Sequence, residues 1–203
     1  MRLPYRLAAI LSYPIVRLVF RGRWTGAANV PASGGGVIAS NHLSNTDAFP
    51  LALGVFPRRQ LVFMAKIELF RPPLGTVMRL LGGFPVDRSR PDRDALQTAV
   101  DLCRRGELLL MFPEGTRRAK GLRKRFVATP HTGAARIALR AGVPLIPAAV
   151  SGTDALARLR PLRVAYGAPI DVSDLAQADR RTAASVATER LMAAIAELER
   201  GLI

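Results

Sequence analysis

The stretch VIASNHLSNTDAFP, residues 37–50, is the part of this sequence that decides its fold. It begins with an apolar run, residues 37–40, that is typical of a buried strand, and the chain then turns polar at once. His42 is one of only two histidines among 203 residues, and Asp47 is the first acidic residue of the chain. An imidazole and a carboxylate therefore lie five positions apart, directly after a buried strand.

Apolar runs and helix-like stretches alternate along the rest of the chain. The apolar runs predict strands at residues 37–40, 61–65, 84–86, 108–112, 144–150 and 162–166. The periodic stretches predict helices at residues 48–55, 74–81, 93–104, 133–140 and 182–200. The last helix has Thr182 as a candidate N-cap and Gly201 just past its end. Since several runs are apolar throughout, as in strands covered on both faces, we predict an α/β sandwich with a largely parallel or mixed sheet flanked by helices.

Composition limits the classes of protein. A chain of 203 residues with 49% hydrophobic residues can build one domain with a substantial core. A single cysteine, Cys103, excludes an internal disulfide framework, and two histidines are too few for a Cys/His metal cluster. The net charge of +15 indicates an anionic partner: nucleic acid, anionic lipid or a phosphorylated substrate. Only 6% of residues are aromatic, without the interleaving of a base-stacking surface, which speaks against nucleic acid.

The N-terminal segment combines arginines with apolar residues. Residues 1–46 include five arginines and no acidic residue. The charge-free run, residues 7–16, has ten residues, about half of the ~20 that a spanning helix needs. At helical spacing, arginines and Tyr13 share a stripe beside a broad apolar face, which is the pattern of a helix lying in a membrane interface. Pro14 would kink or divide this helix. The alternatives are a signal peptide, which Arg17 opposes, and a helix simply packed on the domain.

The chemistry of His42 and Asp47 follows from their place at a strand end, because such ends face the ligand crevice in α/β sheets. A neutral imidazole is a suitable base for a hydroxyl proton near neutral pH, and a carboxylate on its other nitrogen fixes the tautomer. The alternative is structural. SNTD matches a helix capping box, with Ser44 as the cap and Asp47 reaching back, although Pro50 then falls beyond the first turn.

Two further segments contain candidate groups for binding a phosphorylated ligand. In MFPEGTRR, which follows an apolar strand, Gly115 permits an unusual turn, Glu114 can accept hydrogen bonds from hydroxyls, and Arg117 can bind phosphate. In GGFPVDRSR, Arg88 follows a short strand, where its guanidinium can meet a phosphate. In both segments the alternative is an ordinary surface loop with a solvated pair of opposite charges.

Four segments, in this order, resemble the motifs of the 1-acyl-sn-glycerol-3-phosphate acyltransferase family, also called lysophosphatidic acid acyltransferases. The first motif, NH followed by four residues and D, corresponds to residues 41–47. The second, a Gly-rich strand ending in arginine, corresponds to GGFPVDR, and the third, FPEGTR, is intact at residues 112–117. The fourth, the apolar VPxxP strand, corresponds to residues 143–147. The resemblance spans roughly residues 35–152, and the first and third motifs together are highly specific.

This resemblance implies an enzyme with no bound cofactor, whose His42 acts as general base oriented by Asp47. A hydroxyl of a lysophospholipid, first of all 1-acyl-sn-glycerol 3-phosphate, would take the acyl group from acyl-CoA or acyl carrier protein. The positions that match the family's acceptor-binding groups are Lys66, Arg88, Glu114, Gly115, Thr116 and Arg117. We expect a membrane-associating segment at residues 1–24, a catalytic domain at 25–203, and peripheral or monotopic attachment to the cytoplasmic face of the cell membrane.

Two features depart from the motifs or lie beside them. Relatives commonly have a lysine just ahead of the GAARIAL-like helix, where this chain has His131. We interpret His131 as a loop residue near a helix with Thr129 as cap and Pro130 at the first position, the alternative being contact with a different acceptor headgroup. The run RRAKGLRKR, residues 117–125, has six basic residues in nine, and we expect it to attract anionic headgroups, CoA phosphates or an acidic carrier protein.

Two other functions stay open at this point. One keeps the chemistry and changes the acceptor to another lysolipid or a glycolipid. The other is a non-enzymatic basic protein that binds nucleic acid or an anionic membrane. The intact pair of His42 and Asp47, together with a complete FPEGTR motif, favours the enzyme.

Overall fold

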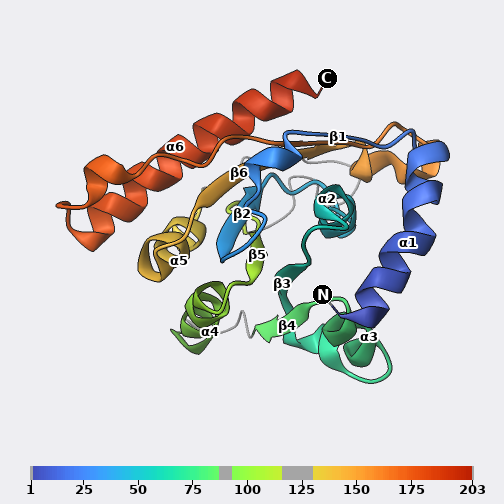
Figure 1. Cartoon of the computed structure of the whole chain (residues 1–203), viewed down its shortest axis with the longest axis horizontal. Helices are drawn as coiled ribbons and strands as arrows, with labels where there is room; N and C mark the ends of the chain where they lie inside the picture. The colour runs from blue at the N-terminus through green and yellow to red at the C-terminus, as the bar shows by residue number, and fades with distance from the viewer. Residues whose placement is uncertain (1, 87–92, 116–129, 203) are drawn as a thin grey trace.

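The computed structural model describes residues 2–86, 93–115 and 130–202, which form a seven-stranded sheet with helices on both faces (Figure 1). The strands are β1 (Arg23–Thr25), β2 (Gly36–Ser40), β3 (Leu61–Lys66), β4 (Gly83–Val86), β5 (Leu108–Met111), β6 (Leu145–Ser151) and β7 (Arg163–Tyr166). The α-helices are α1 (Leu3–Leu18), α2 (Ala48–Val55), α3 (Leu74–Leu80), α4 (Arg93–Arg104), α5 (Gly133–Ala141) and α6 (Arg180–Gly201). Short 3₁₀ helices include η2 (Ile67–Phe70) and η4 (Thr153–Arg158).

The strands lie in the order β1-β7-β6-β2-β5-β3-β4. All neighbours from β6 to β4 pair in parallel, whereas β7 runs antiparallel to β6. At the centre, Val37 of β2 is in register with Leu109 of β5 and with Leu145 of β6. The sheet is therefore mixed and mostly parallel, as predicted, and the carboxyl ends of five strands share one edge.

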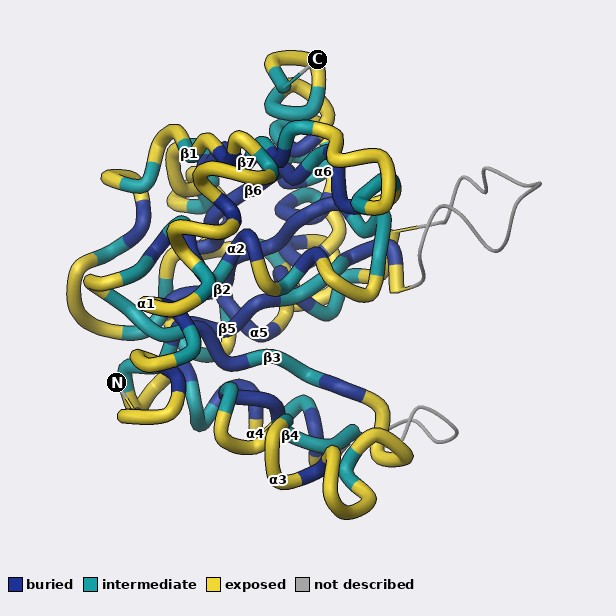
Figure 2. The backbone as a smooth tube through the Cα atoms, turned by 90° about the vertical axis from the view of Figure 1, so that its right-hand side faces the viewer, coloured by how far each residue is buried: buried dark blue, intermediate teal, exposed yellow. Residues whose placement is uncertain are grey.

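Alternate residues of the central strands pack into different cores. Val37 and Ala39 face a core that they form with α4, α5 and α6. Ile38, between them, faces the other core, which includes Leu51 and Val55 of α2. The central strands are accordingly buried along their length (Figure 2). This burial on both faces explains why their sequences are apolar throughout rather than alternating.

The predicted elements are present, with differences at an edge strand and at helix ends. The strand β1 was not predicted, because a three-residue edge strand with exposed Arg23 and Thr25 has no apolar run to mark it. The N-cap of α6 is Asp179 rather than Thr182, since the Asp179 carboxylate accepts hydrogen bonds from the amides of Arg181 and Thr182. The same helix continues through Gly201, which was predicted to lie beyond it.

The helix α1 lies outside α2 and runs through Pro14 without being divided. Only a narrow face is buried, that of Tyr5, Ala9 and Val16. The broad apolar face is exposed, by as much as 70% at Leu11 and 76% at Leu18. The helix therefore packs on the domain and still presents apolar side chains to the outside, as predicted. Within the described ranges, no helix is both long and apolar enough to cross a membrane.

Candidate active site

Asn41 fixes the point at which the chain leaves β2. Its side-chain amide donates to the Val150 carbonyl at 2.9 Å and accepts from the Val150 amide at 2.8 Å, so it extends the β2–β6 pairing by one residue. The same amide also donates to Glu199 of α6 at 2.8 Å. These hydrogen bonds connect the end of β2 to β6 and α6. They fix the direction in which the next residue, His42, leaves the sheet.

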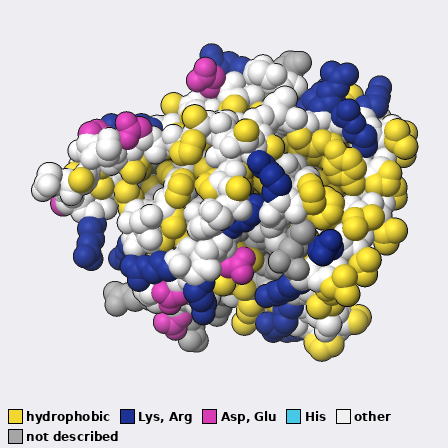
Figure 3. Space-filling model, in the orientation of Figure 1, with side chains coloured by type: hydrophobic (Ala, Val, Ile, Leu, Met, Phe, Trp, Pro, Cys, Tyr) yellow, Lys and Arg dark blue, Asp and Glu magenta, His cyan; other side chains and the backbone are white. Residues whose placement is uncertain are grey.

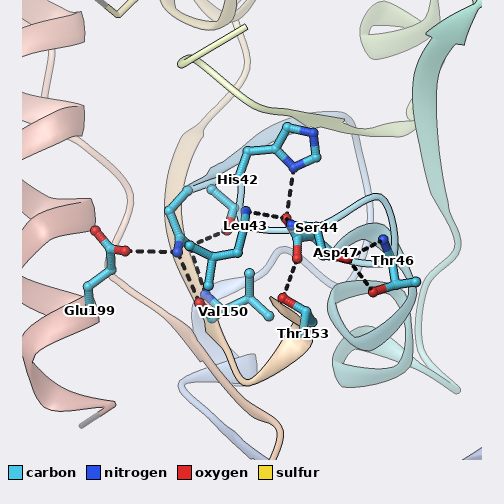
Figure 4. Close-up of polar contacts among 10 residues, drawn as sticks. His42, Leu43, Ser44, Thr46, Asp47, Val150, Thr153 and Glu199 are labelled. Carbon is cyan, nitrogen blue, oxygen red and sulfur yellow. Dashed lines mark hydrogen bonds and ion pairs between the residues drawn. The ribbon is translucent and has the colours of Figure 1, made fainter. Parts of the chain in front are cut away.

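The side chains of His42 and Asp47 are in direct contact (Figure 4). His42 Nδ1 lies 2.7 Å from Asp47 Oδ2, and the two side chains are 17% and 0% exposed. A carboxylate accepts and cannot donate, so Nδ1 carries the proton and donates it to Oδ2. In the neutral ring, Nε2 then has the free lone pair. The geometry gives a partly exposed base whose tautomer is fixed by a buried carboxylate.

The buried charge of Asp47 is compensated by a set of donors from two strand ends. Oδ2 also accepts from the amides of Leu43 at 2.6 Å and Ser44 at 2.9 Å. Oδ1 accepts from the hydroxyl of Thr153, which follows β6. Because an unpaired charge in the interior is costly, these donors are what permits a carboxylate at this depth.

The capping-box alternative is realised in part. Asp47 does reach back to the amide of Ser44, as in a capping box, but the Ser44 hydroxyl contacts Thr46 instead of the Asp47 amide. The helix α2 begins only at Ala48, so Pro50 lies in its first turn, where its missing N–H costs nothing. The same carboxylate therefore serves the loop and the imidazole at once.

The first and third sequence motifs meet through aromatic stacking. The rings of His42 and Phe112 are nearly parallel, at 17°, with their centres 4.1 Å apart. Phe112 follows β5, the strand next to β2, which explains why the two loops come together. The contact restricts rotation of the imidazole and covers one of its faces.

After Phe112 the chain makes a tight turn. Gly115 has φ of +65°, and its amide donates to the Phe112 carbonyl at 3.0 Å. A Cβ on this glycine would lie 2.6 Å from the His131 ring, and the His131 amide donates to the Pro113 carbonyl. Glu114, within the turn, is only 3% exposed. His131 is an exposed loop residue, as predicted, but α5 begins at Gly133 with Thr132 as N-cap, so the prediction of Thr129 as cap and Pro130 at the first position was wrong.

The remaining predicted groups fall partly outside the described residues. Lys66 is exposed at the carboxyl end of β3, on the same edge as His42. Arg88, Thr116, Arg117 and the basic run at 117–125 lie outside the residues that the structure describes.

Asn41, Phe112 and Thr153 are site residues that the sequence reasoning did not assign. Asn41 and Thr153 are polar and follow apolar strands. A polar residue at such a strand end was the signal that identified His42, and the same signal applies to these two residues.

The single cysteine does not belong to this site. Cys103 is 1% exposed in the core, and burial raises the pKa of its thiol to about 11. Among the described residues, no three His, Cys, Asp or Glu side chains are grouped to hold a metal ion. The site therefore consists of an oriented imidazole, a buried acid and a glycine turn.

Comparison with known proteins identifies relatives that cover most of the chain. Residues 21–151 match the Acyltransferase family. The chain is 33% identical over 178 residues to the 1-acyl-sn-glycerol-3-phosphate acyltransferase of Bacillus subtilis, covering 86% of each protein. It is 31% identical over 144 residues to the enzyme of the same name from Streptococcus pneumoniae, covering 68% of this chain and 51% of that protein. The crystal structure of the 1-acyl-sn-glycerophosphate (LPA) acyltransferase PlsC from Thermotoga maritima has a similar fold, with a TM-score of 0.61 at 24% identity over 95% of this chain and 82% of that one.

Proposed function

Because this chain belongs to the Acyltransferase family and is an acyltransferase of the 1-acylglycerol-3-phosphate O-acyltransferase type, we propose that it acylates a lysophospholipid. The acceptor is 1-acyl-sn-glycerol 3-phosphate, the donor is acyl-CoA or acyl carrier protein, and the product is phosphatidic acid. The observation that carries this proposal is the 2.7 Å contact between His42 and Asp47 at the edge where the parallel strands end.

In the proposed mechanism, His42 acts as general base. Its Nε2 takes the proton of the acceptor hydroxyl while the hydroxyl oxygen attacks the thioester carbonyl carbon. The resulting imidazolium is stabilised by the carboxylate of Asp47, whose two oxygens contact four donors. The tetrahedral intermediate then collapses, the C–S bond breaks, and the leaving thiolate takes the proton back from Nε2.

No acyl-enzyme intermediate is needed in this mechanism. The buried Cys103 is unsuited as a nucleophile because its thiol is protonated at neutral pH and sealed in the core. The Ser44 hydroxyl is hydrogen-bonded to Thr46 rather than to His42. Direct transfer from sulfur to the acceptor oxygen accounts for all the groups at the site.

The acceptor would be held next to His42 by the loops at the same edge. We assign Glu114 and Gly115 to the glycerol part of the acceptor, since their turn begins at Phe112, which stacks on His42. The phosphate is assigned to the basic residues Lys66, Arg88 and Arg117, with Thr116 beside them, because a dianionic headgroup requires cationic partners.

Membrane attachment is assigned to residues 1–24, with 25–203 as the catalytic domain. The exposed apolar face of α1 supports this, as do the arginines on the same helix. Exposed apolar residues of α3, among them Val77 at 48%, continue this surface (Figure 3). The start of α1 and the end of α3 are in contact, because Arg2 donates to the Arg79 carbonyl at 2.6 Å. Replacing Leu7 and Leu11 with serine should weaken cosedimentation with vesicles that contain phosphatidylglycerol, and unchanged binding would contradict the assignment.

The acceptor is tested by product mass. The protein is incubated with one acyl thioester and, separately, with lysophosphatidic acid, other lysophospholipids and a glycolipid, and the products are analysed by mass spectrometry. We expect phosphatidic acid from the wild type and none from His42→Ala. Acylation of a different acceptor would replace the proposed substrate, and consumption of no thioester would contradict the enzymatic function.

A further inference from the structure

A wide basic groove lies on the face of the molecule opposite α1. It has a volume of about 1210 Å³ and lies among α4, α5 and the start of α6. Five arginines line it, and no Asp or Glu does among the residues that the structure describes; the arginines are Arg104, Arg136, Arg140, Arg180 and Arg181. The active-site residues are not among its lining, so the groove is a separate feature of the fold.

The five arginines affect their helices differently. Arg104 and Arg140 lie in the last turns of α4 and α5, where the helix dipole favours cations, and Arg104 donates to the Arg140 carbonyl at 2.8 Å. Arg136 and Arg140 are four residues apart on α5, where like charges repel. Arg180 and Arg181 lie in the first turn of α6, which has no acidic residue and where the helix dipole disfavours cations. The Asp179 carboxylate caps this turn by accepting hydrogen bonds from the amides of Arg181 and Thr182. Five arginines around a groove whose described lining contains no carboxylate indicate an anionic partner.

The dimensions and lining of the groove indicate which class of anionic partner it fits. The volume exceeds the ~300–1,000 Å³ of ordinary small-molecule pockets, and no aromatic side chain lines it to stack on a nucleotide base. Its lining includes Leu139, which is half-buried, and the buried side chains of Val100 and Leu175 beneath it. Arginines on three helices around a small apolar floor match an amphipathic helix with an acidic face, in the helix-in-groove mode.

The groove begins beside the active site. Thr132, which lines it, directly follows His131, and the His131 ring lies next to Gly115 of the site turn. From there α5 extends for nine residues, about 14 Å at ~1.5 Å per residue. A partner bound along α5 would thus lie one short helix away from the acceptor turn, at a distance that a flexible thioester arm can cross.

We propose that this groove docks the acidic helix of the acyl carrier protein that delivers the acyl chain. This inference rests on the proposed acyltransferase function and specifies the donor: the carrier protein binds by its acidic surface at α4, α5 and α6, while its thioester arm reaches His42. The guanidinium groups bind carboxylates of the carrier, so binding weakens as salt is raised.

The test replaces both Arg136 and Arg140 with glutamate. With an acyl thioester of one chain length, the KM for acyl carrier protein should rise at least tenfold, whereas kcat and the KM for acyl-CoA should change less than twofold. The matched control is the pair Arg158→Glu and Arg160→Glu, which makes the same charge change at exposed residues outside the groove and should leave both KM values unchanged. An unchanged KM for the carrier, or an equal rise for both donors, would overturn the proposal.

Direct binding separates this inference from the proposed function. Holo-acyl carrier protein without an acyl chain is titrated into the wild type and the groove variant by calorimetry. Binding by the wild type that the variant loses supports docking even if no thioester is consumed, whereas equal binding by both contradicts it. If the glutamate variant does not fold, glutamine at both positions removes the charge with less repulsion, and a rise of at least threefold in the dissociation constant is then expected.

Discussion

Thr153 offers the sharpest test of how the catalytic pair is held. Its side chain is buried, and its hydroxyl donates to Asp47 Oδ1, the oxygen that faces away from His42. Replacing Thr153 with valine keeps the shape and leaves this oxygen buried without its donor. A hydrogen bond to a charged group contributes about 1.5–3 kcal/mol, so the free energy of unfolding should fall by about this amount. We expect kcat to fall about tenfold, equivalent to ~1.4 kcal/mol in the transition state, because the carboxylate is then free to turn away from Nδ1.

The assay measures thiol release from the acyl donor in the presence of lysophosphatidic acid, with unfolding followed separately in urea. Thr153→Ser should restore kcat because it keeps the hydroxyl. Thr188→Val is the matched control: its buried hydroxyl donates to the Ala184 carbonyl at 2.7 Å within α6, so its loss should lower stability by about 0.5–1.5 kcal/mol without changing kcat. If Thr153→Val loses stability and keeps wild-type kcat, Thr153 is only structural.

The remaining predictions concern three other positions. Asp47→Asn should lower kcat by ~10³–10⁴-fold with little change in KM, as in hydrolase triads whose orienting carboxylate is replaced, and a kcat within tenfold of the wild type would show that the carboxylate does not orient His42. Gly115→Ala should lower the free energy of unfolding by about 1–2 kcal/mol, because φ is +65° there and the new Cβ meets His131; unchanged urea unfolding would contradict this. Cys103, with a pKa of about 11, is protonated at pH 8, so iodoacetamide should label it only after unfolding. Mass spectrometry measures the labelling, and rapid labelling of the native protein would contradict the burial of this thiol.

Most strands of the sheet were predictable because they are buried on both faces. Runs such as 37–39 and 108–112 are apolar throughout, and polar residues follow within two positions, so these strands and their functional ends are visible in the sequence. The edge strand β1 gives no such signal, since its pairing with β7 is made by the backbone and two of its three side chains are exposed.

The composition of the active site was less predictable than its location. The spacing of His42 and Asp47 admits both an imidazole pair and a capping interaction, and in the folded chain the carboxylate makes both contacts. Thr153 lies 106 residues from Asp47 in the sequence, so its hydrogen bond depends on the order of the strands in the sheet. The stacking of Phe112 on His42 depends on the adjacency of β5 and β2 in the same way.

The central claim is that Nε2 of His42 removes the proton of the acceptor hydroxyl, and the most direct measurement is the acceptor-dependent rate of thiol release by wild type and His42→Ala. The account predicts that the wild type releases thiol stoichiometrically with phosphatidic acid, and that the variant, with the same unfolding curve, shows no release above the rate without acceptor. Acceptor-dependent turnover by folded His42→Ala within tenfold of the wild-type rate would contradict the claim.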